Sequence, residues 1–84
     1  MAKKEWKTFI AVLSGKSDAN VKFSDMLHLL DSLGFDCRIR GDHYIMSRED
    51  IVEIINLQPE NGKVKRYEVR QVRAIISVKY GLEV

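Results

Sequence analysis

The residues best suited to chemistry surround one histidine near the middle of the chain. His43 directly follows the pair Gly41-Asp42, and Arg38 and Arg40 stand just before that pair. A neutral imidazole can act as a general base and take the proton of a ribose 2′-hydroxyl. Guanidinium groups beside it can stabilise the charge that develops on the phosphate. These residue types predict cleavage of RNA, and the alternative is an ordinary surface histidine near a turn.

A β-hairpin centred on Gly41-Asp42 must position these side chains. The flanking residues alternate between apolar and polar, which is typical of half-buried strands. Glycine suits the first central position of a type II′ turn, so we expect Arg40 to face His43 across the hairpin. In this register the solvent-facing side carries Asp36, Arg38, Arg40, His43 and Ile45. The opposite side is expected to join the core and carries Phe35, Cys37, Ile39, Tyr44 and Met46.

A helix is expected near the start of the chain, over residues 3–13. Apolar residues there follow the i, i+3, i+4, i+7 spacing of one helical face. The residues of that face are Trp6, Phe9, Ile10 and Leu13.

Three further elements complete the predicted domain. A second helix is predicted over 24–33, with Ser24 as its N-cap. Enrichment in β-branched residues predicts a third strand over 51–57. A last helix is predicted over 67–80 and is expected to end at Gly81.

The length and composition are those of one small folded domain spanning residues 1–84. Hydrophobic residues make up 45% and charged residues 31%, which excludes a disordered chain. The order α-α-β-β-β-α predicts an α+β domain whose helices cover one face of a three-stranded antiparallel sheet. The longest apolar run has five residues, so we expect no membrane span, no signal peptide and a cytoplasmic location.

The net charge of +2 conceals an uneven distribution. Residues 61–79 carry six basic side chains against one acidic side chain, a net charge of +5. The spacing of Arg66, Arg70 and Arg73 predicts a basic stripe along one side of the last helix. Such a stripe can contact nucleic-acid phosphates, and the alternatives are a solvated helix face or an acidic partner protein.

Several other kinds of site are excluded by composition. A single cysteine, Cys37, excludes an internal disulfide and a cysteine zinc site, and no Cys/His cluster is present. The run at 14–17, Ser-Gly-Lys-Ser, lacks the upstream glycine and strand of a phosphate-binding loop. We therefore expect no metal and no cofactor.

Four stretches of the chain resemble one known family. They are LDSLGF at 30–35, RGDHYIM at 40–46, IINLQP at 54–59 and YEVRQVR at 67–73. Together they resemble the HicA toxins, also called the YcfA-like family, of bacterial type II toxin–antitoxin modules. The resemblance covers roughly residues 22–82.

The resemblance implies a double-stranded-RNA-binding-domain-like α-β-β-β-α fold, preceded here by an extra helix and loop at 1–17. It also implies an mRNA interferase of the bacterial cytoplasm that a HicB-like antitoxin neutralises. The family's catalytic histidine corresponds to His43 and its turn glycine to Gly41. The commonest family motif is Gly-Ser-His-His, so Asp42 and Tyr44 depart from it.

Two alternatives to the ribonuclease are a non-catalytic module that binds double-stranded RNA and a protein-binding domain that uses an exposed apolar helix face. Either RNA-dependent function needs basic contacts with the phosphate backbone. The candidate RNA-binding residues are Arg38, Arg40, Lys63, Lys65, Arg66, Arg70 and Arg73. A homodimer and a toxin–antitoxin hetero-oligomer both remain open.

Overall fold

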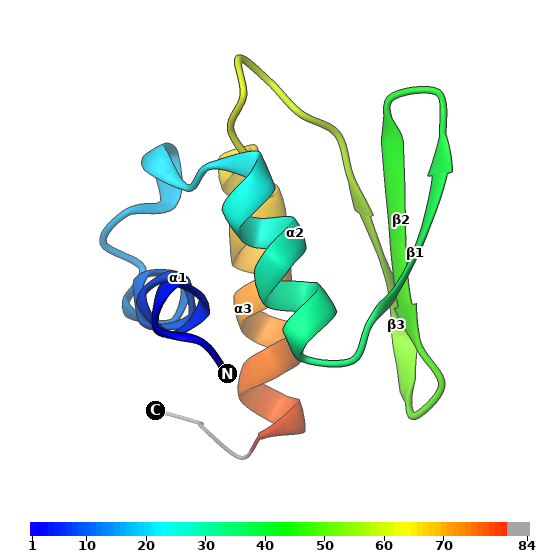
Figure 1. Ribbon diagram of the computed structural model, residues 1–84, viewed down its shortest axis with the longest axis horizontal. Coiled ribbons are helices and arrows are strands. Elements are labelled where there is room, and N and C mark those ends of the chain that lie inside the picture. Colours follow the sequence, from blue (N-terminus) through cyan, green and yellow to red (C-terminus); the bar gives the residue numbers. More distant parts are fainter. Residues whose placement is uncertain (81–84) are drawn as a thin grey trace.

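The computed structural model describes residues 1–80 and has helices packed against one face of a small sheet (Figure 1). The helices and strands follow one another in the predicted order, and one short 3₁₀ helix, η1, is present in addition. The elements are α1 (Lys3–Ser14), η1 (Asp18–Asn20), α2 (Phe23–Ser32), β1 (Asp36–Arg40), β2 (His43–Arg48), β3 (Ile51–Leu57) and α3 (Arg66–Lys79). The α+β class is therefore confirmed, and the predicted stop at Gly81 lies outside the described residues.

The sheet is antiparallel with the strand order β1-β2-β3. Arg40 pairs with His43 and Cys37 with Met46, which is the register expected from the hairpin turn. Gly41 has φ of +61° and Asp42 has no positive φ, as a type II′ turn requires. The hairpin geometry that places His43 is therefore confirmed in full.

The core lies between the helices and the inner face of the sheet. Met46, Ile55 and Leu57 supply the buried side chains of β2 and β3. On the helices, the fully buried apolar side chains are Val12, Met26, Leu29, Leu30, Val69, Val72 and Ile76. Tyr44 is half-buried and packs edge-on against Phe23 of α2, so it faces away from His43.

Two residues that were expected in the core are exposed. Cys37 is exposed, and Ile39 keeps 59% of its surface accessible. Both belong to β1, which is an edge strand, whereas the helices contact the sheet mainly through α3 and β3. The two-residue alternation correctly predicted that Cys37 and Ile39 share the face of the sheet that carries Met46. No helix covers that face at β1, so both side chains remain exposed.

The predicted apolar face of α1 is only partly buried. The helix buries Thr8, Phe9 and Val12, whereas Trp6 is 49% and Ile10 is 61% exposed. The helix packs on α2 and α3 rather than on the sheet, and these partners fix its rotation.

The start of α2 also differs from the prediction. Lys22, not Ser24, occupies the N-cap position, and no side chain caps the helix. The first backbone N–H, at Phe23, instead donates to the carbonyl of Gly62 at 2.9 Å. An orphan donor of the helix is thus satisfied by the loop before α3.

Candidate functional site

His43 stands exposed at the first position of β2, on the outer face of the sheet. Its Nδ1 lies 3.1 Å from Oδ1 of Asn56, which β3 presents on the same face. An amide oxygen accepts a hydrogen bond, so this contact places the proton of a neutral imidazole on Nδ1. The second nitrogen, Nε2, is then the basic one and can accept a proton.

A carboxylate lies close to that basic nitrogen. Nε2 of His43 is 3.7 Å from Oδ1 of Asp42. Asp42 is held in place by Gln58, whose Nε2 donates to its Oδ2 at 2.8 Å, and Lys65 Nζ donates in turn to Gln58 Oε1 at 3.0 Å. The hydrogen bond from Gln58 lowers the pKa of Asp42, and the charges of His43 and Lys65 act in the same direction. An ionised carboxylate thus lies beside the imidazole of His43.

Glu68 fixes the loop that carries Gln58 and Lys65. Its side chain is 1% exposed, and its two carboxylate oxygens accept the backbone N–H groups of Gln58, at 3.0 Å, and Lys65, at 3.1 Å. A carboxylate at the third position of a helix commonly reaches back to the N-cap in this way. Glu68 was missed as a candidate residue, although its position three residues after Lys65 was the available signal.

A pocket of about 210 Å³ opens beside His43, between the end of β3 and the first turns of α3. Apart from His43, its polar lining comes from residues that the sequence analysis did not identify as candidates. They are Asn56, Gln58, Tyr67, Glu68 and Gln71. These positions were not found because two segments that are distant in the sequence build the pocket jointly.

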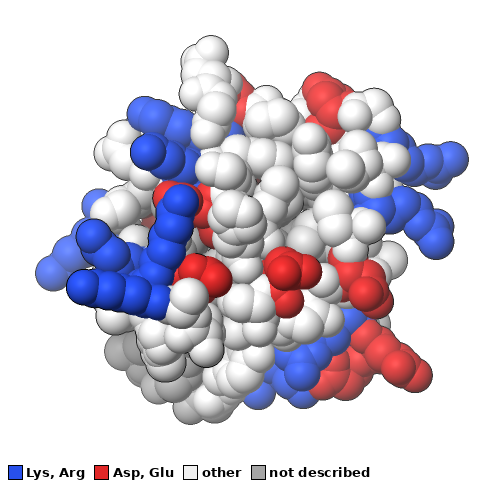
Figure 2. Space-filling model, viewed as in Figure 1, with Lys and Arg blue, Asp and Glu red and all other residues white. Residues whose placement is uncertain are grey.

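Arg38 and Arg40 lie on the same outer face as His43, as expected. Both are exposed, and Arg40 is the direct cross-strand partner of His43. They line a hollow of about 460 Å³ that shares Ile54 with the histidine pocket. In Figure 2 basic side chains project at the side of the molecule where the β1–β2 hairpin lies. A phosphate at this face would meet both guanidinium groups.

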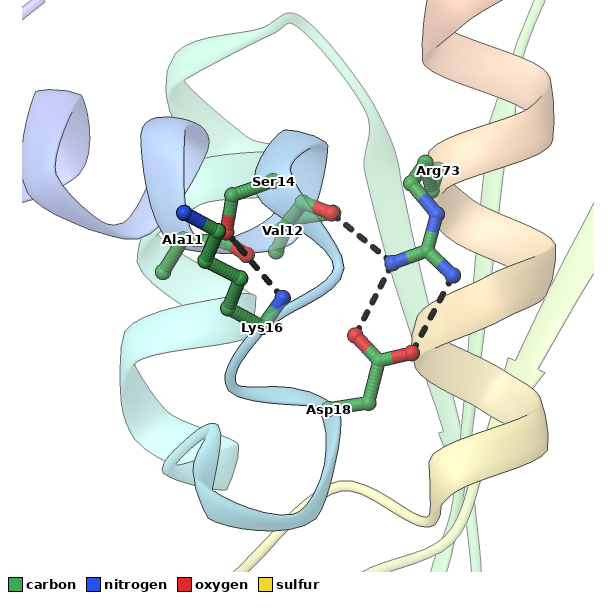
Figure 3. Close-up of polar contacts among 6 residues, drawn as sticks. All are labelled: Ala11, Val12, Ser14, Lys16, Asp18 and Arg73. Atoms are coloured by element: carbon green, nitrogen blue, oxygen red, sulfur yellow. Dashed lines mark hydrogen bonds and ion pairs between the residues drawn. The ribbon is translucent and has the colours of Figure 1, made fainter.

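Arg73 is not available to RNA in the way that the stripe predicted. Its Nη1 donates to the carbonyl of Val12 at 3.0 Å and to Oδ1 of Asp18 at 2.9 Å, and its Nη2 donates to Oδ2 at 3.1 Å (Figure 3). These hydrogen bonds lower the pKa of Asp18. The side chain is only 25% exposed. The expectation for Arg73 is therefore corrected, because its charge is already neutralised within the fold.

The remaining basic residues divide into two groups. Arg66 and Arg70 are exposed on α3, and their charges act on Asp18, which places them toward η1. Lys63 donates to Oδ1 of Asn20 in η1 at 3.2 Å. Lys65 instead donates to Gln58, which donates in turn to Asp42 beside His43. Arg66, Arg70 and Arg73 thus share the side of α3 that faces Asp18, as their spacing predicts. The other basic candidates lie outside α3, and Figure 2 shows basic side chains at two opposite sides of this view.

Within residues 1–80 no three His, Cys, Asp or Glu side chains are grouped so that they could hold a metal ion. None of the helices in that range is both long enough and apolar enough to cross a membrane. Compared with protein families, with curated proteins and with solved structures, the chain matches none of them.

Proposed function

We propose that this protein is a HicA-like ribonuclease toxin, an mRNA interferase that acts in the bacterial cytoplasm and is neutralised by a HicB-like antitoxin. The carrying observation is the exposed imidazole of His43, whose Nδ1 contacts Asn56 and whose Nε2 is left as the base. The order α2-β1-β2-β3-α3 is the one expected of a double-stranded-RNA-binding-domain-like fold, with α1 as the extra helix.

The proposed reaction begins at the ribose 2′-hydroxyl. His43 Nε2 takes the proton of this hydroxyl while its oxygen attacks the adjacent phosphorus. Arg38 and Arg40, on the same face, stabilise the added negative charge of the five-coordinate phosphate. The bond to the 5′-oxygen breaks, which leaves a 2′,3′-cyclic phosphate and a 5′-hydroxyl end. DNA has no 2′-hydroxyl and is not a substrate for this route.

The test is cleavage of a defined RNA by the purified protein in the presence of EDTA. We expect cleavage of RNA and none of the matching DNA. Replacement of His43 by alanine should lower the rate by about 10²- to 10⁴-fold, the usual contribution of general acid–base catalysis. His28→Ala is the matched control, because His28 is an exposed histidine on α2 outside the pocket.

Three results would contradict the proposal. The first is RNA that stays intact with the wild-type protein, and the second is equal cleavage by wild-type protein and His43→Ala. The third is equal growth when the two proteins are expressed in bacteria without an antitoxin, because wild-type protein should arrest growth and His43→Ala should not. Circular dichroism of both proteins establishes that the substitution leaves the fold intact.

A non-catalytic module that binds double-stranded RNA is the second candidate. The observation that favours it is the exposed pair Arg66 and Arg70, which lies toward η1 rather than beside His43. A domain of this kind reads shape and backbone across the minor groove. Its affinity should fall steeply with salt, and Arg70→Glu should abolish binding while the RNA remains intact. In the catalytic case Arg38→Glu and Arg40→Glu should be the more damaging changes.

A further inference from the structure

The pocket beside His43 contains more than one side chain with a dissociable proton. Besides His43, the lining residues of this kind are Tyr67 and Glu68. Glu68 is buried, and both of its oxygens accept backbone hydrogen bonds, from Gln58 and Lys65. It acts as an acceptor that holds the loop. The amides of Asn56, Gln58 and Gln71 are not acids, so Tyr67 is the one remaining proton donor in the lining.

Tyr67 is firmly placed although its ring is accessible. It is the second residue of α3, between the N-cap Lys65 and the buried Glu68. Glu68 ties this turn to the backbone of Gln58, which directly follows β3 and the strand position of Asn56. The backbone positions of Tyr67 and His43 are therefore linked through one short set of hydrogen bonds. The Tyr67 side chain is 58% exposed, which leaves it open to a ligand in the pocket.

We propose that the Tyr67 hydroxyl is the general acid of the cleavage reaction, an inference that rests on the proposed ribonuclease function. As the bond between phosphorus and the 5′-oxygen breaks, Tyr67 gives its phenolic proton to that oxygen. The 2′-hydroxyl proton has meanwhile passed to His43 Nε2. The phenolate and the imidazolium then return to their starting forms by proton exchange with water. No oxidant, metal or further reactant is needed for this balance.

A phenol is chemically suited to this step. A phenol is a far stronger acid than an alcohol, so its O–H can deliver a proton to the strongly basic alkoxide leaving group. Tyr44, which follows His43 in the hairpin, packs inward against Phe23. The hairpin therefore offers no acid of its own, and the pocket supplies one from α3.

The experiment compares two leaving groups at one cleavage site. That site is first mapped on a defined RNA with wild-type protein, and an otherwise identical RNA is then made with sulfur in place of its 5′-bridging oxygen. A thiolate leaves without protonation. We expect Tyr67→Phe to slow cleavage of the ordinary RNA by about 10²- to 10⁴-fold and to approach the wild-type rate on the sulfur-bridged RNA. His43→Ala should be slow on both.

Tyr80→Phe is the matched control. Tyr80 follows the end of α3, and its hydroxyl accepts a hydrogen bond from Arg48 outside the pocket. This variant should cleave both RNAs as the wild type does.

The outcomes separate the inference from the function on which it rests. Ordinary RNA left intact by wild-type protein overturns the ribonuclease function and the role of Tyr67 with it. Cleavage by wild type together with an undiminished rate for Tyr67→Phe overturns only the role of Tyr67. The same holds if Tyr67→Phe is equally slow on both RNAs, because the hydroxyl then acts in some way other than as an acid.

Discussion

Arg73 of α3 binds the carboxylate of Asp18 through both terminal guanidinium nitrogens, at 2.9 and 3.1 Å. The same Arg73 Nη1 donates to the carbonyl of Val12 at 3.0 Å, close to the end of α1. The last turn of α1 has no basic residue of its own, so a cation from another helix satisfies this carbonyl and the negative end of the helix dipole. One side chain thereby joins the N-terminal helix and its following turn to the closing helix.

Removal of this guanidinium should destabilise the fold without harming the chemistry at His43. We expect Arg73→Gln to lower the free energy of unfolding by about 1–3 kcal/mol, because a partly buried carboxylate loses charged hydrogen bonds. Urea denaturation followed by circular dichroism measures the change. Arg70→Gln is the control, since Arg70 is exposed and should change stability by less than about 0.5 kcal/mol. Equal stability of the two variants would show that the Asp18 contact contributes nothing.

The stability supplied by Asp18 should depend on pH. The hydrogen bond from Arg73 holds the pKa of Asp18 below its ordinary value of 3.8. A group whose pKa is depressed in the folded state stabilises the fold above its unfolded pKa and loses this contribution as the pH falls through its folded pKa. The difference in unfolding free energy between wild type and Asp18→Asn should therefore be constant from pH 7 to about pH 5 and shrink below about pH 4. A difference that persists unchanged at pH 2 would contradict this assignment.

Glu68→Gln should weaken both stability and cleavage. The two backbone N–H groups of Gln58 and Lys65 need two acceptors, whereas the glutamine side chain offers one oxygen and a competing NH₂ donor. An unsatisfied buried donor costs about 1–3 kcal/mol. Cleavage should also fall, because this turn positions Tyr67 and Gln58 in the pocket. Glu53→Gln, at an exposed position of β3, is the control and should leave both measurements unchanged.

Asn56→Asp should alter the pH dependence of cleavage. Aspartate keeps an oxygen acceptor for His43 Nδ1 but adds a negative charge, which favours the imidazolium. A general base works only when it is unprotonated, so the acidic limb of the pH–rate profile should move to higher pH. At higher pH, where the base is unprotonated in both proteins, the cleavage rate of Asn56→Asp should differ much less from that of the wild type. A profile that coincides with that of the wild type would mean that Asn56 does not contact the working base.

Local sequence signals determined the hairpin but not the packing around it. The turn at Gly41 and the two-residue alternation were sufficient to predict the pairing of Arg40 with His43. The exposure of Cys37 could not be predicted in this way, because it depends on where the helices end over the sheet. The register of a hairpin is set by two neighbouring strands and their turn. Whether a helix covers the face of a strand depends on how the whole domain packs.

The same distinction applies to the helices and to the site. Apolar residues surround much of α1, so the pattern did not distinguish buried from exposed positions, and only contact with α2 and α3 selects Phe9 and Val12 for the core. Arg73 looked like part of a free stripe because its partner, Asp18, lies 55 residues away in the chain. Long-range pairs of this kind leave no periodic signal.

The exposed position of Trp6 has a spectroscopic consequence. It is the only tryptophan of the chain, and its ring meets Phe9 edge-on at 5.7 Å. Phe9 in turn meets Tyr80, which directly follows α3, at 6.4 Å. The indole fluorescence of Trp6 therefore reports on the seating of α1 against the end of α3, whereas far-ultraviolet dichroism reports on all helices together. If the Asp18–Arg73 link opens before the rest of the domain, the emission of Trp6 changes at a lower urea concentration than the dichroism does.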